Sequence, residues 1–356
     1  MDLIFQTILP FVGVLVVLIV IHELGHYITA KLTGVKVLEA GIGFPPRLWG
    51  FTWRGTIYSL NWLPLGGFVR LLGEEDPSDP QSLAAKPRWV RLIVLAAGSG
   101  MNFVLPIFLF ALVFMIPRDV NVGLTQITNV VPGAPAQEAG LRDGDVIFQI
   151  NGDEVRNVSE VSRAIRLNLG ETIDFYVKHS DGVLETIPVQ SRWTPPEGQG
   201  PTGIQIASLY AFSKSESFPP WTAIGKGASE YRETIILFRN EVTSWFKGSS
   251  GPQFAGPVGI AQATGEIVDQ SGWVALLELA ALLSFNLAII NILPLPMLDG
   301  GRIVFVLLEI VRGGRRIAPE KEGLVHLVGL ALIITLAVAI TVLDVQRIIG
   351  GESLLR

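Results

Sequence analysis

Leu15–His26 reads LVVLIVIHELGH, an apolar run interrupted by two histidines and a glutamate. The run extends from about Leu3 to Ala30, which is long enough to cross a bilayer as a helix. Charged groups are costly in hydrocarbon, so ionisable residues at this depth indicate a functional site. The sequence therefore predicts a membrane-spanning helix that carries chemistry.

His22 and His26 are four residues apart, so they lie on one face of that helix, one turn from each other. Two neutral imidazoles in this arrangement can hold a zinc ion, and the adjacent Glu23 can act as a general base. The alternative is that the three polar side chains only form hydrogen bonds to neighbouring helices. The chain has no cysteine, so His, Asp and Glu are the strong metal ligands available to it.

The composition predicts a membrane protein that carries a soluble insert. Of 356 residues, 49% are hydrophobic and 17% are charged, and mean hydropathy is positive. The net charge of −5, without a long basic run, argues against a nucleic-acid partner. Four apolar stretches are long enough to span: about Leu3 to Ala30, Leu92 to Ile116, Trp273 to Val311 with an interruption, and Leu324 to Ile349.

Positive residues in short loops predict the orientation of these spans. The loop between the first two spans contains Lys31, Lys36, Arg47, Arg54, Arg70, Lys86, Arg88 and Arg91. The loop between the last two contains Arg312, Arg315, Arg316 and Lys321. Both loops are therefore expected in the cytoplasm, with both termini and the insert outside. The histidine motif then lies toward the cytoplasmic end of its span.

The insert has the pattern of a compact α+β unit. Strand signals alternate with Asn, Asp and Gly turns from Asp119, and a short helix is expected over Ser159–Leu167. A periodic amphipathic helix follows over residues 221–246. We expect this helix at the outer membrane interface, with packing on the soluble unit as the alternative.

The first cytoplasmic loop also carries a structural signal. Gly43, a β-favouring segment over Thr56–Trp62 and the stretch Gly66-Gly67-Phe68 combine apolar residues and glycines without a helical period. Non-helical backbone near lipid must be paired internally or face a cavity. The loop is either a small sheet that dips toward the metal or an ordinary surface hairpin.

The third metal ligand must come from elsewhere, because catalytic zinc usually has three protein ligands. Asp299 follows two prolines and precedes two glycines, which break the helix and place a carboxylate in an unwound segment. Glu309 and His326 are rivals, and capping of a helix is the simpler role for Asp299. Glu278 and Asp344 are expected near the outer side, away from the motif.

Asn286 and Asn291 precede the break. Their amides can hold an extended substrate backbone or bond to neighbouring helices, and the pattern alone slightly favours the second role.

Four motifs together resemble the site-2 protease family of intramembrane zinc metalloproteases, in particular its regulator of sigma-E protease branch. They are HELGH at His22–His26, FNLAIINILPLPMLDGG at Phe285–Gly301, PLGGFV at Pro64–Val69 and FAGPVGI at Phe254–Ile260. The second motif is long and specific, and the resemblance covers essentially the whole chain.

The resemblance implies a zinc metalloendopeptidase with one Zn²⁺ bound by His22, His26 and Asp299. Glu23 would activate water, and Asn286 and Asn291 would position the substrate strand. The loop around Gly43, Gly66, Gly67 and Phe68 would be a membrane-dipping β element that pairs with substrate by edge addition.

The implied fold is an α-helical membrane protein with four transmembrane helices, the membrane-dipping β element and an inserted α+β PDZ domain. Its carboxylate-binding loop would be Thr202-Gly203-Ile204-Gln205-Ile206. The expected divisions are 1–118 with the first two spans and the hairpin, 119–208 as the PDZ-like domain, 209–272 as amphipathic helix and linker, and 273–356 with the last two spans. Some members of this branch carry two tandem PDZ domains, whereas this chain has room for one.

The family resemblance also implies location and partners. The protein is expected in the bacterial inner membrane, cleaving transmembrane segments such as those of anti-sigma factors or remnant signal peptides, after a first cut by another protease. The PDZ-like unit would filter substrates or bind C-termini, or act only as a steric plug. The competing interpretations are a non-catalytic membrane PDZ scaffold with a structural metal site, and a metal transporter, for which a second ligand cluster along the chain is missing.

Overall fold

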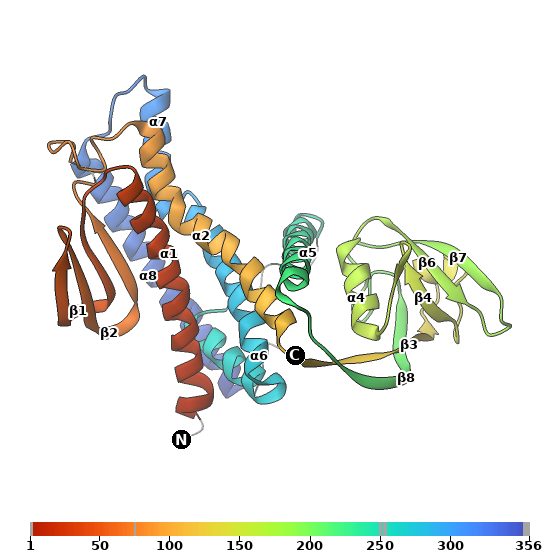
Figure 1. Ribbon diagram of the computed structural model, residues 1–356. Helices are drawn as coiled ribbons and strands as arrows, with labels where there is room; N and C mark the ends of the chain where they lie inside the picture. Colours follow the sequence, from red (N-terminus) through yellow and green to blue (C-terminus); the bar gives the residue numbers. More distant parts are fainter. Residues whose placement is uncertain (1–2, 75, 249–250, 252–254, 352–356) are drawn as a thin grey trace. The chain divides into compact units, whose positions relative to one another are not determined.

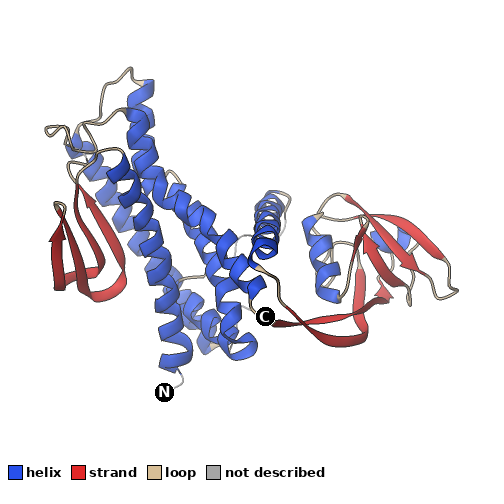
Figure 2. Cartoon of the chain, viewed as in Figure 1, coloured by secondary structure: helices blue, strands red, loops and turns tan. Residues whose placement is uncertain are grey.

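The computed structural model describes residues 3–74, 76–248, 251 and 255–351. The chain divides into two compact units, Met1–Val113 with Phe254–Arg356, and Phe114–Gln253 (Figures 1 and 2). The first unit is mainly helical and the second is built on a sheet. Each unit is described separately below.

Long helices form the first unit. Its helices are α1 (Leu9–Leu32, after a π-helical turn η1 over Leu3–Ile8), α2 (Arg88–Met115), α6 (Pro257–Ile292), α7 (Asp299–Val311) and α8 (Pro319–Ile349). In the described part of the chain, four helices are long and apolar enough to cross a membrane: Gln6–Leu32, α2, α6 and α8. The expectation of four spans is confirmed at this level of length and composition.

The third span follows a helical segment that the sequence analysis did not expect. Helix α6 begins at Pro257, but Gly272, with φ of 74°, is non-helical and divides it, so a new helical segment starts at Trp273, where the apolar stretch was expected to begin. The segment before the kink contains Gln262, Thr264 and Glu266, so hydropathy does not mark it as part of a span. After Ile292 the chain leaves the helix and re-enters one only at Asp299, which is the predicted break.

The loop between α1 and α2 forms a sheet. Strand β1 (Val37–Trp53) pairs antiparallel with β2 (Thr56–Leu71), and both strands bend. Glu39 consequently pairs with Arg70 on one side and with Ile57 on the other. The two bent strands therefore supply four strand segments that lie side by side in the sheet. The last segment of β2 lies against α1, where the Cβ position of Gly67 is 3.8 Å from Glu23 Cγ. The predicted small sheet with close backbone approach is therefore present, formed by two long strands, although the side chains of Pro64 and Leu65 lie outside what the structure describes.

A buried carboxylate joins the start of α6 to the last turns of α8. Asp344 accepts hydrogen bonds from the backbone amides of Gly256 and Gly259, at 2.9 and 2.8 Å, and pairs with Arg347. A Cβ on Gly256 would lie 2.7 Å from the Asp344 carboxylate, so this position has no room for a side chain. The glycines of the FAGPVGI motif thus serve helix packing, while Phe254 itself lies outside the described residues.

The second unit is a six-stranded sheet with helices. Its strands are β3 (Arg118–Val130), β4 (Val146–Ile150), β5 (Asp153–Glu154), β6 (Thr172–Lys178), β7 (Leu184–Gln190) and β8 (Ile204–Glu216). The order is β7-β6-β4-β3-β8, with β5 beside β4, so β8 lies at an edge. Residues of β3, β4, β6 and β7 pack with the short helix α3 (Pro135–Ala139) and with α4 (Val158–Leu167) to form one apolar core.

Strands β3 and β8 are the first and last strands of the sheet along the chain, and they pair with each other in a long two-stranded ribbon. Arg118, the first residue of β3, pairs with Glu216, the last residue of β8. The strand therefore continues beyond residue 208, where the sequence analysis placed the end of the domain. The chain therefore enters the sheet and leaves it at neighbouring positions.

Helix α5 (Pro220–Phe246) packs on α4. Arg163 of α4 forms ion pairs with Glu230 and Glu233, and Asn240 donates hydrogen bonds to the last carbonyls of α4 at 2.9 and 3.0 Å. Packing on the soluble unit was the alternative for this helix, and these contacts account for its polar face.

Candidate metal centre

Three side chains from distant parts of the chain meet in the first unit. His22 Nε2 lies 3.2 Å from His26 Nε2, and Asp299 Oδ2 lies 3.1 and 3.3 Å from the same two atoms. Tetrahedral zinc with bonds of 2.0–2.1 Å separates its ligand atoms by about 3.3 Å. The spacing of these atoms matches that requirement.

The polar surroundings also fit a cation. Asp299 Oδ2 is buried and makes no hydrogen bond of acceptable geometry, although buried polar atoms are nearly always bonded. His26 Nδ1 lies 2.8 Å from the carbonyl oxygen of Val94, which fixes the proton on Nδ1 and leaves the Nε2 lone pair facing the centre. Two lone-pair donors and a carboxylate therefore converge on one point.

Space for an ion comes from Gly98 of α2. A Cβ at this position would lie 2.4 Å from His26 Nε2 and 2.6 Å from His22 Nε2. Helix α2 approaches this closely because Gly25 also lacks a side chain, and a Cβ there would lie 2.4 Å from the carbonyl oxygen of Ala97. The two glycines together let the backbone of α2 lie close to the ligand atoms without a side chain between them.

The break before α7 carries the third ligand. Gly300 and Gly301 lie against the carbonyls of the preceding turn, where a Cβ on Gly300 would be 2.1 Å from the Leu293 oxygen. The amide of Met297 donates a hydrogen bond of 2.9 Å to His326 Nδ1 of α8. Asp299 is the first residue of α7, and Leu298 holds the N-cap position, so the carboxylate is directed to the histidines rather than used as a cap.

The rival ligands have other partners. Glu309 is buried in ion pairs with Arg91, Arg88 and Arg316, and Asp344 binds the start of α6. His326 supports the break through Met297. Among the residues that the structure describes, the potential metal-binding group at this place is His22, His26 and Asp299.

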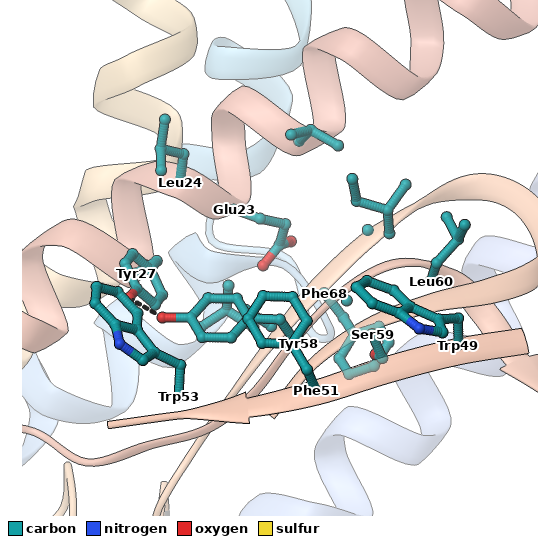
Figure 3. Close-up of a pocket in the computed structure, with 16 residues that line it drawn as sticks. Glu23, Leu24, Tyr27, Trp49, Phe51, Trp53, Tyr58, Ser59, Leu60 and Phe68 are labelled. Carbon is teal, nitrogen blue, oxygen red and sulfur yellow. Dashed lines mark hydrogen bonds between the residues drawn. The ribbon is translucent and has the colours of Figure 1, made fainter. Parts of the chain in front are cut away.

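Glu23 faces a different side of α1 from the two histidines. It lines an apolar cavity of about 570 Å³ between α1 and the β1–β2 sheet (Figure 3). Tyr27 from α1 and Trp49, Tyr58 and Phe68 from the sheet contribute to the same wall. A carboxylate beside the metal ligands and open to a cavity can exchange a proton with a group held there.

The structure also places the predicted substrate-contact residues. Gly67 and Phe68 line the cavity, and Gly66 lies against Ile19 of α1. Gly43 has φ of 78° and lies close to the carbonyls of Asn61 and Leu63. On α6, Asn286 is exposed and Asn291 is half-buried, and neither belongs to the group of three ligands.

The predicted carboxylate-binding loop lies at the start of β8 in the second unit. Ile204, Gln205 and Ile206 pair with β3, and the carbonyl of Gly203 accepts a hydrogen bond from the Val131 amide. Thr202 is buried, and its carbonyl accepts from the Ala136 amide.

Gly98 and Asn102 of α2 were missed in the sequence. Asn102 Nδ2 lies 3.5 Å from His22 Nδ1, and the side chain is completely buried. The signal was the stretch AGSGMN, Ala97–Asn102, where small residues and an amide interrupt an apolar span. Such residues indicate a close helix contact, but not which partner is contacted.

Comparison with known proteins agrees with this centre. The profile of Peptidase family M50 matches residues 10–336. The zinc metalloprotease RasP of Oceanobacillus iheyensis is 30% identical, with 96% of this chain and 99% of that protein covered. A protein of Clostridium perfringens is 34% identical over 336 residues, which is 92% of this chain and 95% of that one.

A solved structure matches a smaller part. The PDZ domain of an SdrC-like protein from Listeria innocua is 24% identical and covers 25% of this chain and 97% of that domain, with a TM-score of 0.21.

The family match and the named relatives cover nearly the full length and confirm the expected class of enzyme, a zinc-dependent metalloendopeptidase with apolar spans. The chain belongs to Peptidase family M50, the site-2 protease family that its motifs resemble.

Proposed function

We propose that this protein cleaves peptide bonds within transmembrane segments at a zinc site formed by His22, His26 and Asp299. The observation that carries the proposal is the convergence of their three ligand atoms, 3.1–3.3 Å apart, beside a helix position with no side chain. Three protein ligands leave the fourth position open, as catalytic zinc sites require and structural sites do not.

The chemistry divides between the metal and Glu23. His22, His26 and Asp299 would hold the zinc ion, which would supply a water acidic enough to be a nucleophile near neutral pH and a positive charge for the scissile carbonyl. Glu23 takes the proton from the attacking water and passes it to the leaving amine. The wall of the cavity beside Glu23 is mostly apolar, so an extended apolar segment can lie against it.

The metal ligands are tested by metal analysis of the purified full-length protein. We expect about one zinc per chain in the wild type and loss of zinc in His22→Ala and in Asp299→Ala, because two ligands hold zinc far more weakly than three. His179→Gln is the matched control, since it removes a buried histidine of the second unit. Full zinc content in either ligand variant would contradict the proposed site, and a fourth protein ligand would favour a structural metal.

The cavity beside Glu23 is proposed as the place of the unwound substrate. A transmembrane helix satisfies its own backbone, so cleavage requires local unwinding and new partners for the freed amides and carbonyls. The last segment of β2 pairs on one side with β1 and lies next to α1, which supports addition of an extended substrate at its edge. Asn286 and Asn291 are proposed to hold the same segment from α6.

The second unit is proposed to be a PDZ-like domain that screens substrates. Its edge strand β8 follows the loop Thr202–Gly203, and α4 lies near β8, an arrangement that suits addition of a peptide strand beside a helix. We place this unit and both termini outside the cytoplasm, and the metal site toward the cytoplasmic side of a bacterial inner membrane. Substrates are proposed to arrive after a first cut, as anti-sigma factors or remnant signal peptides would.

Excision of the sheet tests the screening role. Because Arg118 pairs with Glu216, a short Gly-Ser linker can join residue 117 to residue 217. We expect the full-length enzyme to cleave a shortened substrate and to reject the same substrate with an intact outer domain. The enzyme without the sheet should cleave both. Glu23→Gln in the excised enzyme is the control for cleavage at the same site. Unchanged selectivity would remove the filtering role.

A further inference from the structure

We infer that Asn102 is a positioning residue for the metal centre, whose amide oxygen accepts a hydrogen bond from Nδ1–H of His22 and so leaves Nε2 for the metal. The inference rests on the site proposed above. It gives α2 a supporting part in metal binding, exerted through His22.

The surroundings of Asn102 indicate that its amide has a hydrogen-bonding function. The side chain is completely buried, and its backbone carbonyl accepts a hydrogen bond of 2.8 Å from Ser284 of α6. A buried amide without hydrogen bonds costs stability, and an apolar residue of similar size would pack at less cost. Asn102 lies four residues after Gly98, so both face the metal centre from one side of α2.

The two histidines need the same support and obtain it from different groups. A neutral imidazole that binds metal through Nε2 carries its proton on Nδ1, and that N–H needs an acceptor. For His26 the acceptor is the carbonyl of Val94, at 2.8 Å. For His22 the group beside Nδ1 is the amide of Asn102, at 3.5 Å.

The orientation of this amide decides which form of His22 is stabilised. With Nδ2 toward the ring, Asn102 donates to Nδ1 and forces the proton onto Nε2, which would then face the ligand atoms of His26 and Asp299. A half turn of the amide places Oδ1 against Nδ1–H instead and frees the Nε2 lone pair. Oδ1 makes no hydrogen bond in its other position, so the half turn breaks no existing bond of that oxygen.

The test compares Asn102→Leu with Asn102→Asp in the purified full-length protein, by measuring the zinc dissociation constant in competition with a chelator. Asn102→Leu keeps the number and branching of the heavy side-chain atoms and removes the acceptor, so zinc binding should weaken roughly 10- to 100-fold, as for other supporting hydrogen bonds of ligand histidines. Asn102→Asp keeps an acceptor and should bind zinc within about threefold of the wild type. A role in packing predicts the opposite order, because a buried carboxylate packs worse than leucine.

Two further variants keep the result decisive. Asn102→Met replaces the leucine variant if that protein does not fold, because its flexible side chain adapts to the same space. Ser284→Ala is the matched control: it removes the neighbouring hydrogen bond to the Asn102 backbone and should leave the zinc dissociation constant unchanged.

The outcomes separate this inference from the proposed function. Zinc binding in Asn102→Leu within about threefold of the wild type, or weaker binding in Asn102→Asp than in Asn102→Leu, would overturn the positioning role. If His22→Ala loses zinc while Asn102→Leu retains it, only the positioning role fails. If His22→Ala retains zinc, the proposed metal site itself fails.

Discussion

Glu23→Gln should retain zinc and lose cleavage by two to four orders of magnitude, which is the usual contribution of a general base. Glutamine has the size of glutamate and can form hydrogen bonds, but it does not take a proton from water. Glu23 lines the cavity while the ligand atoms belong to His22, His26 and Asp299, so the substitution leaves the metal ligands intact. The measurement is cleavage of a transmembrane substrate in detergent or vesicles, together with zinc content.

Glu23→Asp is the matched variant, since it keeps a carboxylate and shortens its reach. We expect its rate between those of the wild type and Glu23→Gln. Cleavage by Glu23→Gln near the wild-type rate would reject the proton-transfer role, and loss of zinc from that variant would mean that Glu23 also supports the metal.

Gly98→Ala should weaken zinc binding by roughly 10- to 100-fold, because overpacking costs about 1–3 kcal/mol and each 1.4 kcal/mol is tenfold in affinity. The added Cβ would lie 2.4 and 2.6 Å from the two ligand nitrogens, so either the imidazoles or α2 must move. Zinc affinity and cleavage should fall together, since the same atoms are displaced.

Gly100→Ala is the control on the same helix. A Cβ at Gly100 would contact nothing within 4 Å, and alanine favours helix more than glycine does. This variant should bind zinc and cleave as the wild type does. Equal zinc affinity in Gly98→Ala and Gly100→Ala would show that α2 yields easily and that Gly98 does not shape the centre.

Much of the first unit could be predicted because its signals are local. The i, i+4 spacing of His22 and His26 fixes their common face, and the prolines and glycines around Asp299 predict the broken helix. The choice of Asp299 over Glu309 was less local. In the structure, Glu309 is neutralised by arginines from α2 and from the loop after α7, which sequence spacing does not reveal.

The features that escaped prediction depend on contacts between distant segments. Gly98 looks like any small residue of an apolar helix until the imidazoles are placed against it. The beginning of α6 at Pro257 was missed because its first turns carry polar residues, while Asp344 in α8 supplies the bonds that hold that end. The four side-by-side segments of the β1–β2 sheet depend on bends in both strands, and the short turn between the strands does not by itself set the register of their pairing.

The pairing of Arg118 with Glu216 has a consequence for how proteins of this kind can diverge. An insertion whose entrance and exit are adjacent behaves as an interchangeable cassette, because its length does not alter the span between the helices that flank it. If the second unit screens substrates as proposed, duplication or replacement of this insertion would change which substrates are cleaved and leave the metal centre unchanged. Substrate selection and catalysis could then evolve independently on this scaffold.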